Sequence, residues 1–143
     1  MFKKITNFLY LGDMNSQPKF CDFEVSVANQ LFLPNDNSSN NFYNLLANKI
    51  YFNFDSFVVD KYQIKFIVDF IFKKAKTNII YLHCQFGVNR SPFITFIFLV
   101  RYNYLQAKNY KEALTKFRGI YPFIGLGFNF LRFIKKNYPF KNL

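Results

Sequence analysis

A cysteine, a glycine and an arginine occupy one short stretch of this chain at spacings that suit phosphate chemistry. Cys84 offers a thiol, which is a nucleophile in its ionised form. Gly87 allows backbone conformations and close approaches that a side chain would prevent. Arg90 presents a planar fork that donates to two phosphate oxygens at once, which lysine does not do. The stretch is therefore predicted to bind a dianion next to a thiol.

The sequence predicts a strand before this stretch and a helix after it. Residues 78–84, NIIYLHC, form a continuous apolar run, which is typical of a central strand buried on both faces. Ser91 and Pro92 favour the start of a helix. A loop between a strand and a helix directs backbone N–H groups and the positive end of the helix dipole toward one point. The residues expected to bind the phosphate group are Gln85, Phe86, Gly87, Val88, Asn89 and Arg90.

The thiol of Cys84 has to be ionised before it can react. A free cysteine has a pKa of about 8.5 and is mostly protonated at neutral pH. A substantial lowering of that pKa requires about 4 kcal/mol of extra stabilisation of the anion, and a helix dipole contributes at most about 2 kcal/mol. The remainder is expected from Arg90, the loop N–H groups and the Ser91 hydroxyl. A thiolate held in this way can attack phosphorus and form a phosphocysteine.

The stretch at 83–91 resembles a known signature. HCQFGVNRS matches the His-Cys-(five residues)-Arg-Ser/Thr pattern of the cysteine-based protein tyrosine phosphatases. NFLYLG at 7–12 and KEALTKFRGIYPFI at 111–124 are similar to the opening strand and the penultimate helix of the dual-specificity branch. The resemblance extends over about residues 5–134 and implies one catalytic domain, here 1–143. It implies an α/β fold in which a mostly parallel, twisted central sheet is flanked by helices and the phosphate-binding loop joins a central strand to a helix.

The resemblance also implies a role for each matched side chain. Cys84 would be the nucleophile, and Arg90 would hold the phosphate. Ser91 would assist release of the thiolate. His83 would orient the loop and tune Cys84 without acting as the general base. In this family the leaving group takes its proton from an aspartate on a separate loop upstream of the cysteine.

Asp55 is the predicted general acid. It follows KIYFNF at 49–54, whose alternation predicts a strand, so Asp55 and Cys84 would both stand at carboxyl ends of strands, where open α/β sheets place their sites. Asp60 is the alternative, although its position suits the cap of a following helix. Asp69 is expected on the solvated side of that helix.

Two features depart from the family pattern. Phe86 replaces the usual alanine, and its ring would either line the rim and stack on an aryl phosphate or pack against the body of the protein. The turn at 124–128 is short and lacks the Pro-Asn pair whose asparagine braces the loop in the family. The loop is therefore expected to be less rigid, unless Asn89 replaces that brace.

Apolar spacing predicts the remaining elements. Gly119 and Pro139 are expected to end the last two helices, and the polar run NDNSSNN at 35–41 is expected to be a surface loop. The predicted strands are 5–12, 23–29, 49–54 and 78–84, and the predicted helices are 60–75, 91–104, 109–119 and 127–138.

Composition restricts the class of protein. Hydrophobic residues make up 51% of the chain, with 22 Phe and 10 Tyr, so a core can form without disulfides or a metal. One histidine and two distant cysteines supply no metal-ligand set, and no cofactor is expected. Cys21 is expected to be buried, with a reversible disulfide to Cys84 as the alternative. We expect a soluble, cytoplasmic protein without a signal sequence or membrane span, in the host cytoplasm if it is viral or a secreted effector.

The leading functional hypothesis is a dual-specificity phosphatase acting on phosphotyrosine and on phosphoserine or phosphothreonine in proteins. The chain is short for the recognition loop that deepens the pocket of tyrosine-only relatives. A phosphatase of RNA 5′-ends or of phosphoinositides is a rival that the net charge of +11 would suit, although the charge also fits a drift in composition. The second rival is a non-catalytic phosphate-binding module. The oligomeric state is left open.

Overall fold

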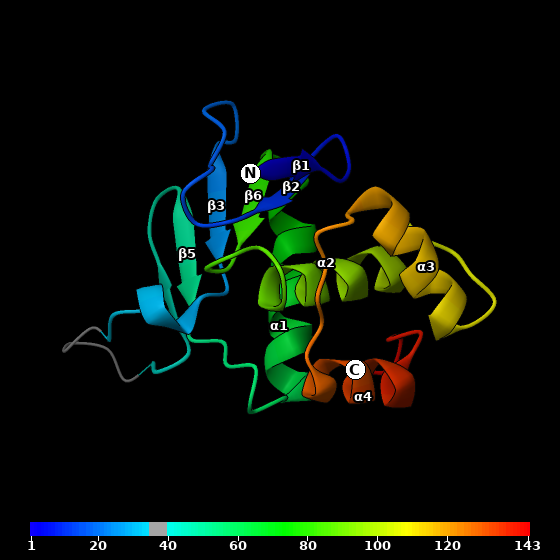
Figure 1. The fold of residues 1–143 in the computed structure, drawn as a ribbon. Helices are drawn as coiled ribbons and strands as arrows, with labels where there is room; N and C mark the ends of the chain where they lie inside the picture. The colour runs from blue at the N-terminus through cyan, green and yellow to red at the C-terminus, as the bar shows by residue number, and fades with distance from the viewer. Residues whose placement is uncertain (35–39) are drawn as a thin grey trace.

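The computed structural model describes residues 1–34 and 40–143. It is an α/β fold, as predicted, with a mixed sheet flanked by helices, although five of the strands precede the first α-helix along the chain (Figure 1). Their bounds are β1 Phe2–Lys4, β2 Leu9–Gly12, β3 Phe23–Ser26, the 3-10 helix η1 Asn29–Leu31, β4 Tyr43–Leu45, β5 Lys49–Phe52, α1 Lys61–Lys74, β6 Ile80–His83, α2 Arg90–Arg101, α3 Tyr110–Ile120 and α4 Phe128–Asn137.

The sheet has a parallel centre and antiparallel edges. Its strand order is β1-β2-β6-β3-β5-β4, and the four inner strands run parallel. The two edge strands are antiparallel and were not predicted. The predicted strand at 5–12 is wrong in its first half, because the Ile5 and Thr6 N–H groups donate to the Leu9 carbonyl and close a turn that folds β1 back on β2. β6, the strand that leads into the phosphate-binding loop, is buried along its whole length.

The helices pack as a layer against one face of the sheet (Figure 1). α2 contacts β2 and β6, and α1 lies beside α2. α4 is joined to α2 by the stacked rings of Phe93 and Phe130, whose centroids are 3.8 Å apart. On the other face, Tyr81 is buried and donates a hydrogen bond of 2.5 Å to the Asp13 carbonyl, just after β2. β6 is therefore covered on both sides, which fixes the loop that follows it.

The structure tests two sequence predictions about where helices begin and end. Asp60 caps α1, because its carboxylate accepts a hydrogen bond of 2.8 Å from the Tyr62 N–H. The prediction that Gly119 ends a helix is wrong: α3 continues to Ile120, and the Tyr121 N–H still donates to the Phe117 carbonyl. Glycine lowers helix stability but does not stop a helix whose hydrogen bonds continue.

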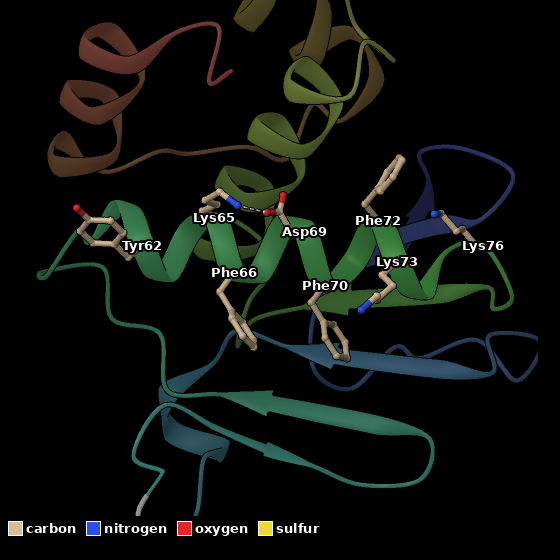
Figure 2. Close-up of a pocket in the computed structure, with 8 residues that line it drawn as sticks. All are labelled: Tyr62, Lys65, Phe66, Asp69, Phe70, Phe72, Lys73 and Lys76. Atoms are coloured by element: carbon tan, nitrogen blue, oxygen red, sulfur yellow. Dashed lines mark hydrogen bonds and ion pairs between the residues drawn. The ribbon is translucent and has the colours of Figure 1, made fainter. Parts of the chain in front are cut away.

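The prediction that Asp69 is solvated holds only in part, because 34% of its side chain is exposed. Its carboxylate is half-buried and accepts hydrogen bonds from Lys65 Nζ at 2.6 Å and from Arg101 Nε at 3.2 Å. Figure 2 shows the Lys65 and Asp69 side chains joined on α1. The reason is that α2 packs close enough for its last arginine to reach this carboxylate, so Asp69 links two helices.

Within residues 1–34 and 40–143, no helix has both the length and the apolar character needed to cross a membrane. The predicted surface loop at 35–41 falls mostly on positions 35–39, which lie outside the described residues.

Candidate active site

The loop that the sequence predicts to bind phosphate, called the phosphate-binding loop below, runs from the end of β6 to the start of α2. Gly87 lies in its middle with a φ of +72°, a conformation that side chains disfavour. A Cβ atom at this position would lie 2.7 Å from the backbone carbon of Gly12. The loop therefore needs glycine here for two reasons, its backbone conformation and its packing against the end of β2.

Three carbonyl groups of the loop accept hydrogen bonds from donors that lie outside the loop. A carbonyl that accepts from an outside donor turns its peptide plane outward, which leaves N–H groups for the interior of the loop. The donors are the Met14 N–H to Gln85 at 3.3 Å, the Tyr121 hydroxyl to Gly87 at 2.6 Å and the Gly125 N–H to Val88 at 2.8 Å.

The thiol of Cys84 lies at the base of this loop and is almost fully buried. Ser91 Oγ donates to Cys84 Sγ at 3.2 Å. Burial acts to raise the pKa of this thiol, but hydrogen bonds from the Ser91 side chain and from the Ser91 and Gly87 backbones, with the charge of Arg90, outweigh it. The pKa of Cys84 is therefore lowered from its ordinary value, and the geometry favours a thiolate.

Arg90 is held by a short segment that the sequence analysis missed. Its Nη1 donates to Asn29 Oδ1 at 2.5 Å and to Gln30 Oε1 at 2.8 Å. Gln30 Nε2 also donates to Gln85 Oε1 at 3.0 Å. η1 thus joins both ends of the phosphate loop. The signal was available, because η1 follows a parallel strand beside β6, at the edge where such sheets place their sites.

His83 lies beneath the loop rather than at its opening. It is buried, and its Nδ1 is 3.0 Å from the Cys84 carbonyl oxygen. Its Nε2 is 3.4 Å from Glu24 Oε1 on β3. Burial acts to raise the pKa of Glu24, but the neighbouring His83, Lys49 and Tyr51 side chains hold that pKa below its usual value. Glu24, which the sequence analysis did not single out, therefore lies against the ring whose other nitrogen is 3.0 Å from the Cys84 carbonyl oxygen.

Asp55 lies in the segment that follows β5, and its half-buried carboxylate accepts a hydrogen bond of 2.8 Å from the Phe57 N–H. The next residues, Ser56 and Phe57, border a depression of about 340 Å³ together with Asn89 of the phosphate loop. The segment that carries Asp55 thus lies beside the loop, whereas Asp60 lies at the start of α1 as its cap.

The sequence matches no family model and no curated protein. Solved structures do match the fold. DUSP15 aligns with a TM-score of 0.71 at 16% identity, over 94% of this chain and 85% of that one. A leucine rich repeat and phosphatase domain containing protein from Entamoeba histolytica aligns with a TM-score of 0.66 at 17% identity, over 99% and 95%. PTPMT1 in complex with PI(5)P aligns with a TM-score of 0.65 at 15% identity, over 94% and 92%.

The fold is that of the dual-specificity protein tyrosine phosphatases. This confirms the fold that the HCQFGVNRS motif implied. The structure also shows how the two departures from the family pattern, Phe86 and the short turn at 124–128, are arranged. Phe86 is 69% exposed, so its ring does not pack against the body of the domain. Asn89 Oδ1 accepts a hydrogen bond of 2.8 Å from the Gly127 N–H, so the loop is tied to the short turn through Asn89.

The second cysteine has a contrasting environment. Cys21 is buried at the start of β3, as expected, and both thiols are free. Burial, with the nearby charge of Asp22, raises the pKa of Cys21 to about 11. The Cys21 thiol is therefore protonated at neutral pH, whereas the surroundings of Cys84 favour its ionised form.

Proposed function

We propose that this protein is a cysteine-dependent phosphatase that hydrolyses phosphomonoesters through a phosphocysteine intermediate. The observation that carries the proposal is the Cys84 sulfur, which accepts hydrogen bonds from Ser91 and Gly87 at the base of the loop. A buried thiol without such donors has a raised pKa, as Cys21 does. The fold and the loop geometry support the assignment.

In the first half-reaction the Cys84 thiolate attacks phosphorus and forms an S–P bond. The bond from phosphorus to the leaving oxygen breaks, and Asp55 in its protonated form gives that oxygen its proton. The loop N–H groups and the Arg90 guanidinium bind the three other phosphoryl oxygens, on which charge accumulates in the transition state. Arg90 has its Nε and Nη2 donors left for the phosphate, because Asn29 and Gln30 engage only its Nη1 in the free protein.

In the second half-reaction water attacks the phosphocysteine. The Asp55 carboxylate takes the proton from that water, inorganic phosphate forms, and the S–P bond electrons return to Cys84 as thiolate. The Ser91 hydroxyl donates to the sulfur at 3.2 Å, so it stabilises the charge on the departing thiolate. The cycle returns the thiolate and the protonated carboxyl with which it began.

We infer that phosphorylated proteins, with phosphate on tyrosine, serine or threonine, are the first substrates to test. The 69% exposure of Phe86 fits an open rim that a short phosphoserine side chain can pass. Phosphoinositides are the second candidate, because a solved structure of this fold holds PI(5)P. We place the protein in a reducing compartment such as the cytoplasm, since a catalytic thiolate has to stay free there.

Hydrolysis of p-nitrophenyl phosphate tests the proposal and separates it from a non-catalytic phosphate-binding module. The wild type should release p-nitrophenol, and Cys84→Ser should abolish release. Rapid acid quenching during turnover should trap phosphate on the Cys84 peptide, detected by mass spectrometry. Equal rates in the wild type and in Cys84→Ser would refute the cysteine mechanism. A panel of phosphopeptides, phosphoinositides and 5′-phosphorylated RNA would then rank the substrates.

A further inference from the structure

The outward side of α4 combines large apolar side chains with cations. Phe128, Leu131, Arg132 and Lys135 follow helical spacing and form one exposed stripe. Phe128 is 69% exposed, and the Arg132 guanidinium lies 4.5 Å from the centroid of its ring. The opposite side of the helix already fills the core, so packing within the domain does not account for this stripe.

The stripe continues onto the segment that follows Asp55. Phe57 and Val58, two consecutive apolar residues, are 84% and 64% exposed. A depression of about 450 Å³ joins Phe57 to Arg132 of α4, and Lys61 and Lys136 also border it. We call Phe57, Val58, Phe128, Leu131, Arg132 and Lys135 the α4 face.

The α4 face carries positive charges that no bordering acidic side chain among the described residues balances. Within the described residues, no acidic side chain borders the three depressions on and beside it. The nearby carboxylates of Asp55 and Asp60 each accept a backbone N–H of their own turn. An anionic partner would therefore meet cations over this face.

The α4 face adjoins the phosphate-binding loop. Phe57, Phe128 and Gly127 border one depression with Asn89, the residue immediately before Arg90. A partner that covers the α4 face is consequently positioned beside the opening of the active site.

We propose that the α4 face docks on an anionic lipid bilayer and presents the active site to phosphorylated lipid head groups. The docking half stands on the surface alone, and the catalytic half rests on the proposed function with phosphoinositides, its second substrate candidate, in place of phosphorylated proteins. Exposed apolar side chains enter the interfacial region of a bilayer, and neighbouring Lys and Arg bind its anionic head groups. RNA fits less well, because bases would stack only on Phe57 and Phe128 and would leave Val58 and Leu131 without an apolar partner.

The exposed side of α1 offers a matched control surface. Its depression of about 500 Å³ is bordered by lysines and aromatic rings, as in the α4 face, but Lys65 is paired there with Asp69 (Figure 2). Lys73 and Lys76 also border it, and no residue of the phosphate-binding loop does. Lys73→Gln with Lys76→Gln therefore removes the same charge as Arg132→Gln with Lys135→Gln, at a surface apart from the active site.

Cosedimentation with vesicles measures docking without catalysis. The full chain should bind phosphatidylcholine vesicles that contain phosphatidylserine far better than pure phosphatidylcholine vesicles. Arg132→Gln with Lys135→Gln should weaken binding about 30-fold, because each cation near an anionic surface contributes about 1 kcal/mol, or about fivefold. Phe57→Ala with Phe128→Ala should also weaken it, and the α1 control pair should bind like the wild type.

Catalysis is measured on the same variants with two substrates. Hydrolysis of p-nitrophenyl phosphate in solution should be unchanged in every pair, which shows that the variants fold. Hydrolysis of a phosphatidylinositol monophosphate in the vesicles should fall in both α4-face pairs and not in the α1 control.

Each outcome decides the proposal. The proposal is overturned if the wild-type protein does not bind phosphatidylserine vesicles. It is also overturned if the α4-face variants bind these vesicles as well as the α1 control does. A loss confined to binding of a 5′-phosphorylated oligoribonucleotide would overturn it too. If vesicles bind as expected but no phosphomonoester is hydrolysed, the proposed catalytic function fails and the docking surface stands.

Discussion

The side-chain oxygen of Asn89 accepts a hydrogen bond of 2.8 Å from the Gly127 N–H and ties the phosphate-binding loop to the start of α4. The family brace, a Pro-Asn pair in the turn before this helix, is absent from the chain. The bond therefore supplies from the loop side the link that the family resemblance led us to expect from the turn side.

Asn89→Ala should lower kcat/KM for an aryl phosphate about fivefold to tenfold, which corresponds to one net hydrogen bond of about 1 kcal/mol. Gly127→Ala is the matched control, because it keeps the N–H and its Cβ would lie 3.6 Å from the nearest Asn89 atoms. Steady-state kinetics on both variants checks this. Equal losses in the two would show that the turn, and not this bond, matters.

Ser91→Ala should slow alkylation of Cys84 by iodoacetamide at neutral pH about tenfold. The serine hydroxyl donates to the sulfur at 3.2 Å, and a hydrogen bond to a charged group contributes about 1.5 kcal/mol or more. Thr95→Val is the control, since Thr95 is a buried hydroxyl one turn further along α2 that donates to the Ser91 carbonyl and not to the sulfur. Unchanged alkylation in Ser91→Ala would contradict the role given to this serine.

Asp55→Asn should lower kcat by about 10²–10⁴ on substrates with poor leaving groups and much less on aryl phosphates whose phenols are acidic. The reason is that only poor leaving groups need a proton from the enzyme. Asp60→Asn should keep near-normal kcat in both assays, because its carboxylate caps α1. A kcat loss confined to Asp60→Asn would reverse the two roles.

The ion pair between α1 and α2 makes stability depend on pH. Burial acts to raise the pKa of Asp69, but hydrogen bonds from Lys65 and Tyr102 and the charge of Arg101 lower it below 3.8. A lowered folded-state pKa contributes stability above the unfolded value, and the contribution disappears as pH falls through the folded-state pKa. Asp69→Asn should therefore reduce the melting temperature at neutral pH and hardly at all in strong acid.

Thermal unfolding at several pH values measures the Asp69 effect. Lys65→Gln is the comparison, because it removes one donor and leaves Arg101 and Tyr102 on the carboxylate, so its deficit should be smaller. An Asp69→Asn deficit that persists unchanged in strong acid would show that packing, and not charge, causes it.

The parts of the site that follow one another in sequence were predictable. The apolar run into Cys84, the glycine at a positive φ and the helix start at Arg90 are local features with local signals. The contacts of η1 with Arg90 were not predicted, because they join residues far apart in the chain and depend on strand order. The edge strand β1 was missed for a similar reason: a short exposed strand has no apolar alternation to reveal it.

The direct test of the central claim is the pH dependence of alkylation at the two cysteines, followed by mass spectrometry in one sample. The account predicts that Cys84 reacts with a pKa below that of an ordinary thiol, about 8.5, while Cys21 reacts only near its pKa of about 11. Cys84 titrating like an ordinary thiol, or together with Cys21, would contradict the thiolate on which the phosphatase assignment depends.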